Sequence, residues 1–403
     1  VESLFESFDN SPVSAASIAQ VHFAVTRPLD EGEEAREVAV KVLRPGIEAA
    51  VGKDLELFYW LAETAERVEP KLRRLKPVEV VALFERTVRI EMDLRMEASA
   101  CDELGQNFAG DPTYRVPDVD WERTGQRVMT QTRLSGIRMS DRKALVEAGH
   151  DSGTILANAA AIFFNQVFRD GFFHGDQHPG NMFVCADGAI GAVDFGIMGR
   201  LDRKTRFFLA DMLIATLARD YAKLAQVHVA AGYLPPDQPI DTFAQALRAV
   251  GEPIFGRPLE RISFARLLGQ LLRVTESFDM PVQPQLVLLQ KNMLMAEGVS
   301  RQIDPSLNIW LLAEPLILRW MHENRGPAAR ARQAGEEISA AVERLPGVLS
   351  ALESVIEKAA SEGIPVHTES LGAALGRRRR QGWGWPMALA CAALALALVA
   401  LVT

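Results

Sequence analysis

The stretch FHGDQHPGN at residues 173–181, followed thirteen residues after its last member by DFG at residues 194–196, decides the fold of this chain. Phosphoryl transfer to a hydroxyl needs a carboxylate near the attacking oxygen, and Mg²⁺ prefers carboxylate, amide and water oxygens as its ligands. Asp176, Asn181 and Asp194 supply such oxygens. The pattern therefore predicts a site for a nucleotide and Mg²⁺, with Asp176 as catalytic carboxylate and with Asn181 and Asp194 as metal ligands.

The same residues match a longer pattern. Protein kinases carry H-R-D-x-x-x-x-N followed by D-F-G, and His174, Asp176 and Asn181 have this spacing, while Gly175 replaces the arginine. Taken singly, each residue has a plainer interpretation, as a loop cap or a turn residue. His178 beside a proline could ligate a metal, but without partners it is better explained as structural. Their shared order and spacing favour the kinase-like interpretation.

A lysine upstream fits the same site. The segment EVAVK at residues 37–41 matches the V-A-I-K strand of kinases, whose lysine reaches the α- and β-phosphates. Lys41 stands in an apolar strand, so its ammonium needs a partner. The helix predicted downstream offers Glu97 as the ion-pair partner and leaves Glu91 and Asp93 to face the site. A solvated acidic helix face is the alternative for these carboxylates.

The segment that should cover the phosphates departs from the kinase pattern G-x-G-x-x-G-x-V. It reads SAASIAQV at residues 14–21, which places serine or alanine at all three glycine positions. A Cβ restricts the backbone freedom that glycine allows. We therefore expect a stiffer loop that holds nucleotide differently and transfers slowly to protein substrates. The predicted nucleotide-binding residues are Ser14, Ala16, Ser17, Ala19, Val21 and Lys41.

Periodicity predicts an α+β chain with a small mixed lobe and a larger helical lobe. Strands are predicted at residues 18–25, 37–43, 182–185 and 190–193, the last two joined by the turn Asp187-Gly188. Short strands and turns are expected at residues 115–138 and a loop at residues 172–181. Helices are predicted at 47–67, 77–107, 151–171 and through 202–318 with breaks at 232–239 and 251–258, followed by an amphipathic tail at 323–376.

Composition excludes several classes of function. The net charge of −8 argues against general nucleic-acid binding, which needs a basic surface. The three cysteines form no CxxC pair or zinc-ligand spacing, which argues against a disulfide framework or zinc site and favours a reducing compartment. The chain begins at Val1 without a signal peptide, and we expect that an upstream segment is missing.

The C-terminus predicts a membrane anchor. Residues 387–402 carry no charged side chain, although the run is shorter than the ~20 residues of a spanning helix. Trp383 and Trp385 extend it, and four arginines at residues 377–380 precede it. Because basic flanks stay in the cytoplasm, we expect the globular part to face the cytoplasm at a bacterial inner membrane. A buried core helix is the alternative.

Five ordered motifs resemble the UbiB/ADCK family of atypical kinase-like proteins, which is tied to ubiquinone (coenzyme Q) biosynthesis. The similarity covers residues 11–221, about half of the chain. Its motifs are SAASIAQVH (14–22), VAVKVLRPGI (38–47), EMDLRMEA (91–98), FFHGDQHPGN (172–181) and VDFGIMGRL (193–201).

The resemblance implies a kinase-like fold that binds ATP and Mg²⁺ and has weak ATPase rather than efficient protein kinase activity. It carries over Lys41 and Glu97 as an ion pair, Asp176 as base, and Glu91 and Asp93 as an extra acidic motif. Two departures stand out. The family's upstream Lys-x-Gly-Gln motif does not occur before residue 14, which fits a missing N-terminal segment. The anchor is one short segment, where bacterial relatives commonly have a helix pair.

These inferences define the predicted organisation and function. The domains are an N-lobe at 1–132, a C-lobe at 133–325, a helical linker at 326–382 and a transmembrane anchor at 383–403. The favoured function is ATP hydrolysis supporting ubiquinone biosynthesis at the membrane, by handling lipid or quinone precursors or organising the biosynthetic enzymes. The alternatives are a small-molecule phosphotransferase of the aminoglycoside or choline type and a non-catalytic nucleotide-binding scaffold.

Overall fold

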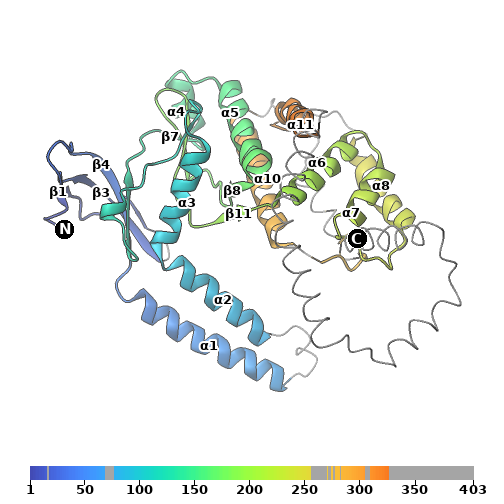
Figure 1. The fold of residues 1–403 in the computed structure, drawn as a ribbon, viewed down its shortest axis with the longest axis horizontal. Coiled ribbons are helices and arrows are strands. Elements are labelled where there is room, and N and C mark those ends of the chain that lie inside the picture. Colours follow the sequence, from blue (N-terminus) through green and yellow to red (C-terminus); the bar gives the residue numbers. More distant parts are fainter. Residues whose placement is uncertain are drawn as a thin grey trace, which may run out of the picture. The chain divides into compact units, whose positions relative to one another are not determined.

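An antiparallel sheet forms the N-terminal part of the fold (Figure 1). The computed structural model describes residues 1–15, 18–68, 77–255, 270, 274–275, 277–281, 283–304 and 309–325. The strands predicted at 18–25 and 37–43 are confirmed as neighbours in this sheet. In pairing order its strands are β1 (Phe5–Phe8), β3 (Ala19–Thr26), β4 (Glu37–Leu43) and β6 (Val128–Thr132), with β2 (Ser14–Ala15) on β3.

Alternation along β4 sorts its side chains onto two faces of the sheet. Val38 and Val40 are buried with Phe5. Leu43 lies two residues beyond Lys41 and belongs to the larger core cluster that also contains residues of α3. Because successive strand residues point to opposite faces, Lys41 shares the face of Leu43. The two-residue period of the strand therefore directs the lysine toward α3.

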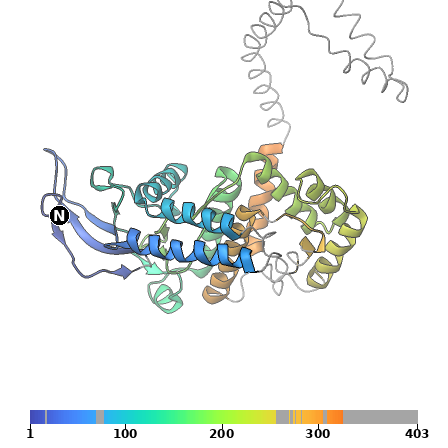
Figure 2. The same ribbon diagram turned by 90° about the horizontal axis from the view of Figure 1, so that it is seen from below.

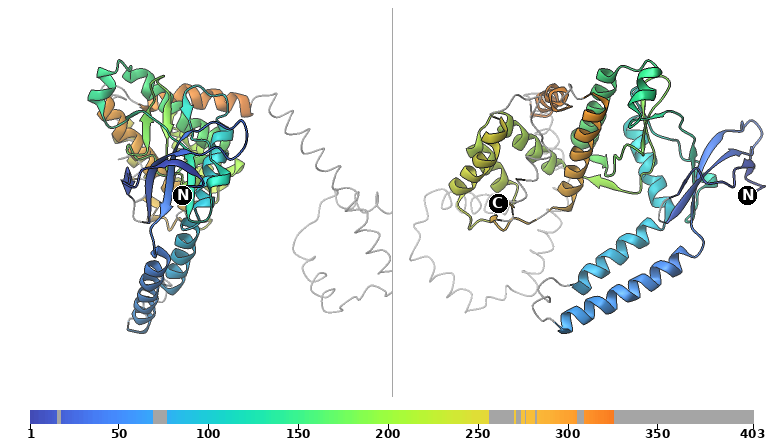
Figure 3. Two further views of the ribbon diagram at one scale, coloured as in Figure 1. Left: turned by 90° about the vertical axis from the view of Figure 1, so that its left-hand side faces the viewer. Right: turned by 180° about the vertical axis from the view of Figure 1, so that it is seen from behind.

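Three helices follow the first strands: α1 (Ile47–Val68), α2 (Pro77–Glu91) and α3 (Leu94–Asn107). Helices α1 and α2 run side by side (Figures 2 and 3), and the Tyr59 hydroxyl donates to Glu85 Oε2 at 2.7 Å. The prediction of one helical stretch over 77–107 is wrong at its middle. Asp93 has extended backbone angles and its carboxylate caps α3 by accepting from the Arg95 amide at 3.1 Å. Helix α2 ends at Glu91, and Asp93 starts α3 as its N-cap.

A second sheet contains the predicted hairpin. Its strands pair in the order β5 (Tyr114–Arg115), β10 (Ile190–Ala192), β9 (Met182–Val184) and β7 (Ile137–Arg138). Strands β9 and β10 are antiparallel, and Gly188 in their turn has φ +83°, a conformation that glycine adopts at little cost. The hairpin prediction is confirmed, and β5 pairs with β10 in parallel.

The expected loop at 172–181 is wrong over its first three residues. Phe172–His174 forms β8, which pairs with β11 (Met198–Arg200). Phe172 and Phe173 are buried, and a strand buries these rings while satisfying its backbone groups. The segment 173–181 therefore begins on a strand rather than in a loop.

Helices make up the rest of the described chain. The break predicted at 232–239 is confirmed, but the one at 251–258 is wrong at its start, because α8 continues through Gly251. A Cβ at Gly251 would lie 2.5 Å from the Tyr221 hydroxyl, so this glycine serves close packing rather than a turn. The elements are α4 (Arg142–Glu147), α5 (Ser152–Phe164), the π-helical turn η3 (Asn165–Asp170), α6 (Arg203–Leu217), α7 (Tyr221–Ala230), α8 (Ile240–Phe255), α10 (Pro284–Ile303) and α11 (Ile309–Arg325), with a 3₁₀ turn η2 (Trp121–Arg123) before β6.

The predicted membrane anchor lies in a part of the chain that the structure does not describe. Within the described ranges, no helix combines the length and the apolar character needed to cross a bilayer. The predicted linker at 326–382 and the anchor at 383–403 lie outside the described residues.

Candidate active site

Three side chains from distant parts of the sequence meet at the inner face of the N-terminal sheet. Lys41 Nζ on β4 lies 2.7 Å and 2.8 Å from the two carboxylate oxygens of Glu97 on α3. The same ammonium lies 3.0 Å from Oδ1 of Asp194, which follows β10. The structure thus brings together the lysine, glutamate and DFG aspartate that the sequence selects.

The charges of this cluster depend on each other. Burial alone would lower the pKa of Lys41, but the carboxylates of Glu97 and Asp194 outweigh it and raise the pKa above its ordinary value. Burial alone would raise the pKa of Asp194, but the Lys41 ammonium lowers it below its ordinary value. Burial raises the pKa of Glu97 above its ordinary value, and with both carboxylates ionised the formal charge of the cluster is negative, which suits a site that receives a divalent cation.

The DFG segment has an unusual backbone conformation and is held by a contact with Glu97. Asp194 has φ +66°, a left-handed conformation that is uncommon outside glycine. Phe195 is 1% exposed, and its amide donates to Glu97 Oε1 at 3.3 Å. Glu97 therefore holds both Lys41 and the residue that follows Asp194, so a single glutamate links strand, helix and hairpin.

The motif around Asp176 is held by backbone contacts. His174 is fully buried, and its Nδ1 accepts from the Asp176 amide at 3.1 Å. The Asn181 side-chain nitrogen donates to the Asp176 carbonyl at 3.3 Å, which leaves the amide oxygen of Asn181 for another partner. The Val193 amide donates to the Asn181 carbonyl at 3.0 Å. Asn181 is thereby tied to the residue directly before Asp194.

Gly175, where kinases have arginine, is explained by the neighbouring strand. Its amide donates to the Ile197 carbonyl at 2.7 Å. A Cβ at this position would lie 2.9 Å from that carbonyl oxygen and 2.8 Å from Ile197 Cγ2. The close approach of the two backbones requires glycine, so the motif gives up the arginine.

Helix α10 supplies two residues that the sequence analysis missed. Lys291 Nζ lies 2.6 Å from Asp176 Oδ1. Asn292 is fully buried, its side-chain nitrogen donates to the His174 carbonyl, and its oxygen accepts from the Gln177 amide at 3.4 Å. The signal was present as three consecutive polar residues, QKN, inside the apolar run LVLLQKNMLM at residues 286–295, but nothing local indicates which loop they contact.

The alanine-rich segment lies next to Lys41 only in part. Val21 pairs with Lys41 across β3 and β4, and Ser14 pairs with Val21 across β2 and β3. Ala19 is buried in the core. Ala16 and Ser17 lie outside the described residues. The nucleotide-binding roles of these residues therefore stay predictions.

The two extra acidic residues differ in their surroundings. Burial, and then the nearby Asp194 carboxylate, raise the pKa of Glu91 above its ordinary value, which places Glu91 within electrostatic reach of the site. The Asp93 carboxylate caps α3 and receives Arg95 Nη2 at 2.6 Å. The structure thus gives Asp93 a structural contact, and its role toward the site stays a prediction.

The donor set fits a magnesium ion that arrives with a nucleotide. Asp194 is 46% exposed, so its carboxylate is accessible to a further ligand, and Asn181 retains an amide oxygen. Within the described residues there is no group of three or more His, Cys, Asp or Glu that could hold a metal. Mg²⁺ is commonly held by one or two carboxylates together with substrate phosphates and water, and this pair of oxygens suits that arrangement.

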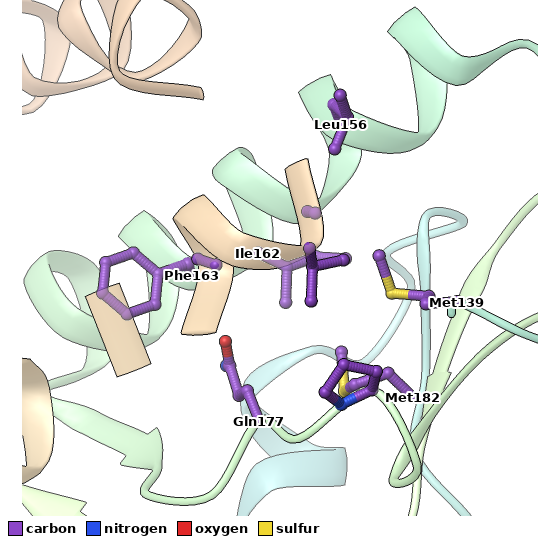
Figure 4. A pocket seen from close by; sticks show the side chains of 10 residues that line it. Met139, Leu156, Ile162, Phe163, Gln177 and Met182 are labelled. Atoms are coloured by element: carbon purple, nitrogen blue, oxygen red, sulfur yellow. The ribbon is translucent and has the colours of Figure 1, made fainter. Parts of the chain in front are cut away.

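An apolar pocket lies beside the catalytic loop (Figure 4). It is bounded by α5, α10, β9 and the loop that follows Asp176, and Gln177 is a polar member of its lining. The pocket has a volume of about 40 Å³, which is far smaller than the several hundred Å³ typical of small-molecule sites. Side chains that line it include Met139, Leu156, Ile162, Phe163 and Met182.

Comparison with known families gives two matches that follow each other along the chain. Residues 1–228 match the ABC1 atypical kinase-like domain, and residues 247–308 match the UbiB helical domain. The first match contains Lys41, Glu97, Asp176 and Asp194, and the second contains Lys291 and Asn292. The first match alone covers more than half of the chain.

Individual relatives agree with the family matches. Proteins named "Probable protein kinase UbiB" from Azotobacter vinelandii and Marinobacter nauticus are 41% and 40% identical over 361 and 367 residues. These alignments cover 89% and 90% of this chain but 65% and 66% of the relatives, so the chain spans about two thirds of their length.

A solved structure supports the fold. The complex of Rv3197 with erythromycin from Mycobacterium tuberculosis is 25% identical, covers 78% of both chains and superposes with a TM-score of 0.56. The likeness, together with the family match to a kinase-like domain, confirms the predicted kinase-like fold.

Proposed function

The chain belongs to the family of ABC1 atypical kinase-like proteins with a UbiB helical domain, and from this premise we propose that it binds ATP with Mg²⁺ and hydrolyses ATP slowly. The observation that carries the proposal is the ammonium of Lys41 held between Glu97 at 2.7 Å and Asp194 at 3.0 Å. This lysine–glutamate pair beside a DFG aspartate is the arrangement that positions ATP phosphates in kinases.

Each residue has a role that its surroundings support. Lys41 reaches the α- and β-phosphates, and Glu97 holds it in place. Asn181 and Asp194 would hold the metal, and an ion bound there would supply charge that neutralises the phosphate oxygens. Asp176 orients the attacking oxygen. The stiff alanine-rich segment and the lack of arginine at Gly175 favour slow turnover.

The link to quinone chemistry comes from the family. The relatives' name and the resemblance of the five motifs support a role in ubiquinone biosynthesis. An apolar molecule, such as a lipid or quinone precursor, is the substrate class that the resemblance to this family implies. We propose that ATP turnover is coupled to the handling of such a precursor at the membrane, in association with the biosynthetic enzymes.

The proposal is tested with Asp194→Asn, which keeps the shape of the side chain and removes its charge. We expect ATPase activity with Mg²⁺ and liposomes to fall by about 10²-fold or more, because the variant loses a metal ligand and a partner of Lys41. Asp187→Asn, which changes an exposed aspartate in the hairpin turn, should keep wild-type activity. When the two variants are returned to a deletion strain, Asp194→Asn should fail to restore the ubiquinone content of the cell, and Asp187→Asn should restore it. Equal ATP turnover by wild type and Asp194→Asn would reject the mechanism.

A second candidate is a small-molecule phosphotransferase. It is favoured by the solved relative, whose structure is a complex with erythromycin, and by the similarity of the HGDxHxxN core to small-molecule kinases. Phosphorylated products in a metabolite screen, rather than free phosphate, would favour it.

A further inference from the structure

The carboxylate at the centre of the catalytic motif already has a cationic partner. Lys291 Nζ on α10 lies 2.6 Å from Asp176 Oδ1, and the two side chains are 45% and 29% exposed. A lysine ammonium has three donors, and this contact uses one. The exposure of Lys291 leaves its ammonium accessible to a bound ligand.

The position of Lys291 is fixed by its neighbour in the sequence. Asn292 is fully buried and bonds the motif twice, through the His174 carbonyl and the Gln177 amide. Gln166, on the π-helical turn after α5, is also fully buried and accepts from the His174 amide at 3.0 Å and from Gln177 Nε2 at 3.3 Å. These contacts hold the backbone of α10 beside the segment that contains Asp176, so the Lys291 side chain extends from a fixed position to the Asp176 carboxylate.

Residues 173–181 contain no lysine or arginine, so this segment itself places no permanently charged cation beside Asp176. Lys41 is held by Glu97 and Asp194. In phosphoryl transfer, charge develops on the oxygens of the transferred group, and a positioned cation there gives a large part of the rate.

We propose that Lys291 is a further catalytic residue, which contacts the γ-phosphoryl oxygens of ATP while it holds Asp176. This inference rests on the proposed ATP site. In hydrolysis, the water oxygen forms a bond to Pγ, and the bond from Pγ to the β–γ bridging oxygen breaks, leaving its electron pair on ADP. The water proton passes to Asp176 and then to solvent. Lys291 keeps its proton throughout and stabilises the charge on the transferred group.

Under this proposal, residues from two domains form the active site. Lys291 and Asn292 lie within the UbiB helical domain, at residues 247–308, whereas Asp176 lies within the kinase-like domain, at residues 1–228. The kinase-like domain alone would therefore lack a cation at the γ-phosphate.

The experiment compares ATP and ADP binding and steady-state ATP turnover in three variants of the full chain. Lys291→Met should lower the maximal turnover by about 10²-fold and weaken ATP binding severalfold while leaving ADP binding unchanged, because ADP lacks the γ-phosphate. Lys291→Arg, which keeps the charge, should retain most of the turnover. Lys143→Met removes a cation that is 86% exposed and pairs with the exposed Glu147, and it should behave as wild type.

The outcomes separate this inference from the proposed function. Wild-type turnover and an unchanged preference for ATP over ADP in Lys291→Met would overturn the role of Lys291 alone. Failure of the wild type to bind either nucleotide with Mg²⁺ would overturn both. If Lys291→Met is not folded by circular dichroism, Lys291→Gln, which can still bond Asp176, takes its place. A folded Lys291→Gln with low turnover supports the charge role, and one with wild-type turnover rejects it.

Discussion

At the scale of single residues, the site is organised by shared partners. Glu97 holds Lys41 with both carboxylate oxygens and also receives the Phe195 amide. Asp176 is held by Lys291 and by its own backbone contact to His174. Because Glu97 is buried, removal of Lys41 would leave its carboxylate without this partner, so we expect substitutions of this pair to lower stability as well as nucleotide binding. Substitutions of residues outside the site can test how packing supports it.

Gly199, on β11, supports the strand that carries His174. A Cβ at this position would lie 2.1 Å from Cζ of Phe173, whose ring is fully buried. We predict that Gly199→Ala lowers the free energy of unfolding by about 1–3 kcal/mol, because the buried ring must shift. Gly298→Ala, on α10 with no atom within 4 Å of the added Cβ, should raise it by roughly 0.4–1 kcal/mol. Urea unfolding of both variants tests this, and equal effects would contradict the packing argument.

At the scale of elements, helices begin and end where a side chain satisfies free backbone groups. Asp93, Asp151 and Asp202 each cap a helix by accepting from an amide two or three residues later, and Asp93 divides the predicted helix in two. Helix α10 contacts residues that lie more than a hundred positions earlier in the sequence. It packs against α5 through apolar side chains and delivers Lys291 and Asn292 to the catalytic motif.

Helix α7 gives a prediction about pH. Burial lowers the pKa of His228, whose Nδ1 lies 2.8 Å from the Leu224 carbonyl oxygen and whose ring packs on Phe243. As pH falls below the ordinary value of about 6.5, the unfolded chain takes up a proton that the folded helix resists. The free energy of unfolding therefore falls toward acid. His228→Phe should reduce this fall between about pH 7.5 and 5.5, on either side of that ordinary value, measured by urea unfolding at both values. The same slope in both proteins would count against burial of a neutral imidazole.

At the scale of the whole molecule, ligand binding should stabilise the folded chain by mass action. At a hundredfold excess of MgATP over its Kd, linkage predicts about 2.7 kcal/mol of added stability. Thermal unfolding should show a higher midpoint with ATP and Mg²⁺ than without, and EDTA should reverse the increase if the metal is shared by protein and phosphates. A midpoint that ATP raises equally with and without Mg²⁺ would contradict the assignment of Asn181 and Asp194.

Local pattern was sufficient for much of this protein. Alternation placed β3 and β4, the turn at Gly188 placed the β9–β10 hairpin, and motif spacing selected Lys41, Asp176 and Asp194. Glu97 was chosen among the carboxylates of the predicted helix, with support from the family resemblance. These signals work because period, turn chemistry and motif order are written within a few residues of each other. They also selected the kinase-like fold, since the same residues must converge to serve one nucleotide.

Only the tertiary structure decided what stands opposite each buried face. The pairing of β5 with β10, the strand formed by Phe172–His174 and the contact of Lys291 with Asp176 join segments far apart in sequence. Periodicity reports that a face is buried but not which segment covers it, because apolar contacts are non-directional. The close backbone contact at Gly175, the N-cap at Asp93 and the contact of Lys291 with Asp176 could therefore be identified only from the tertiary structure.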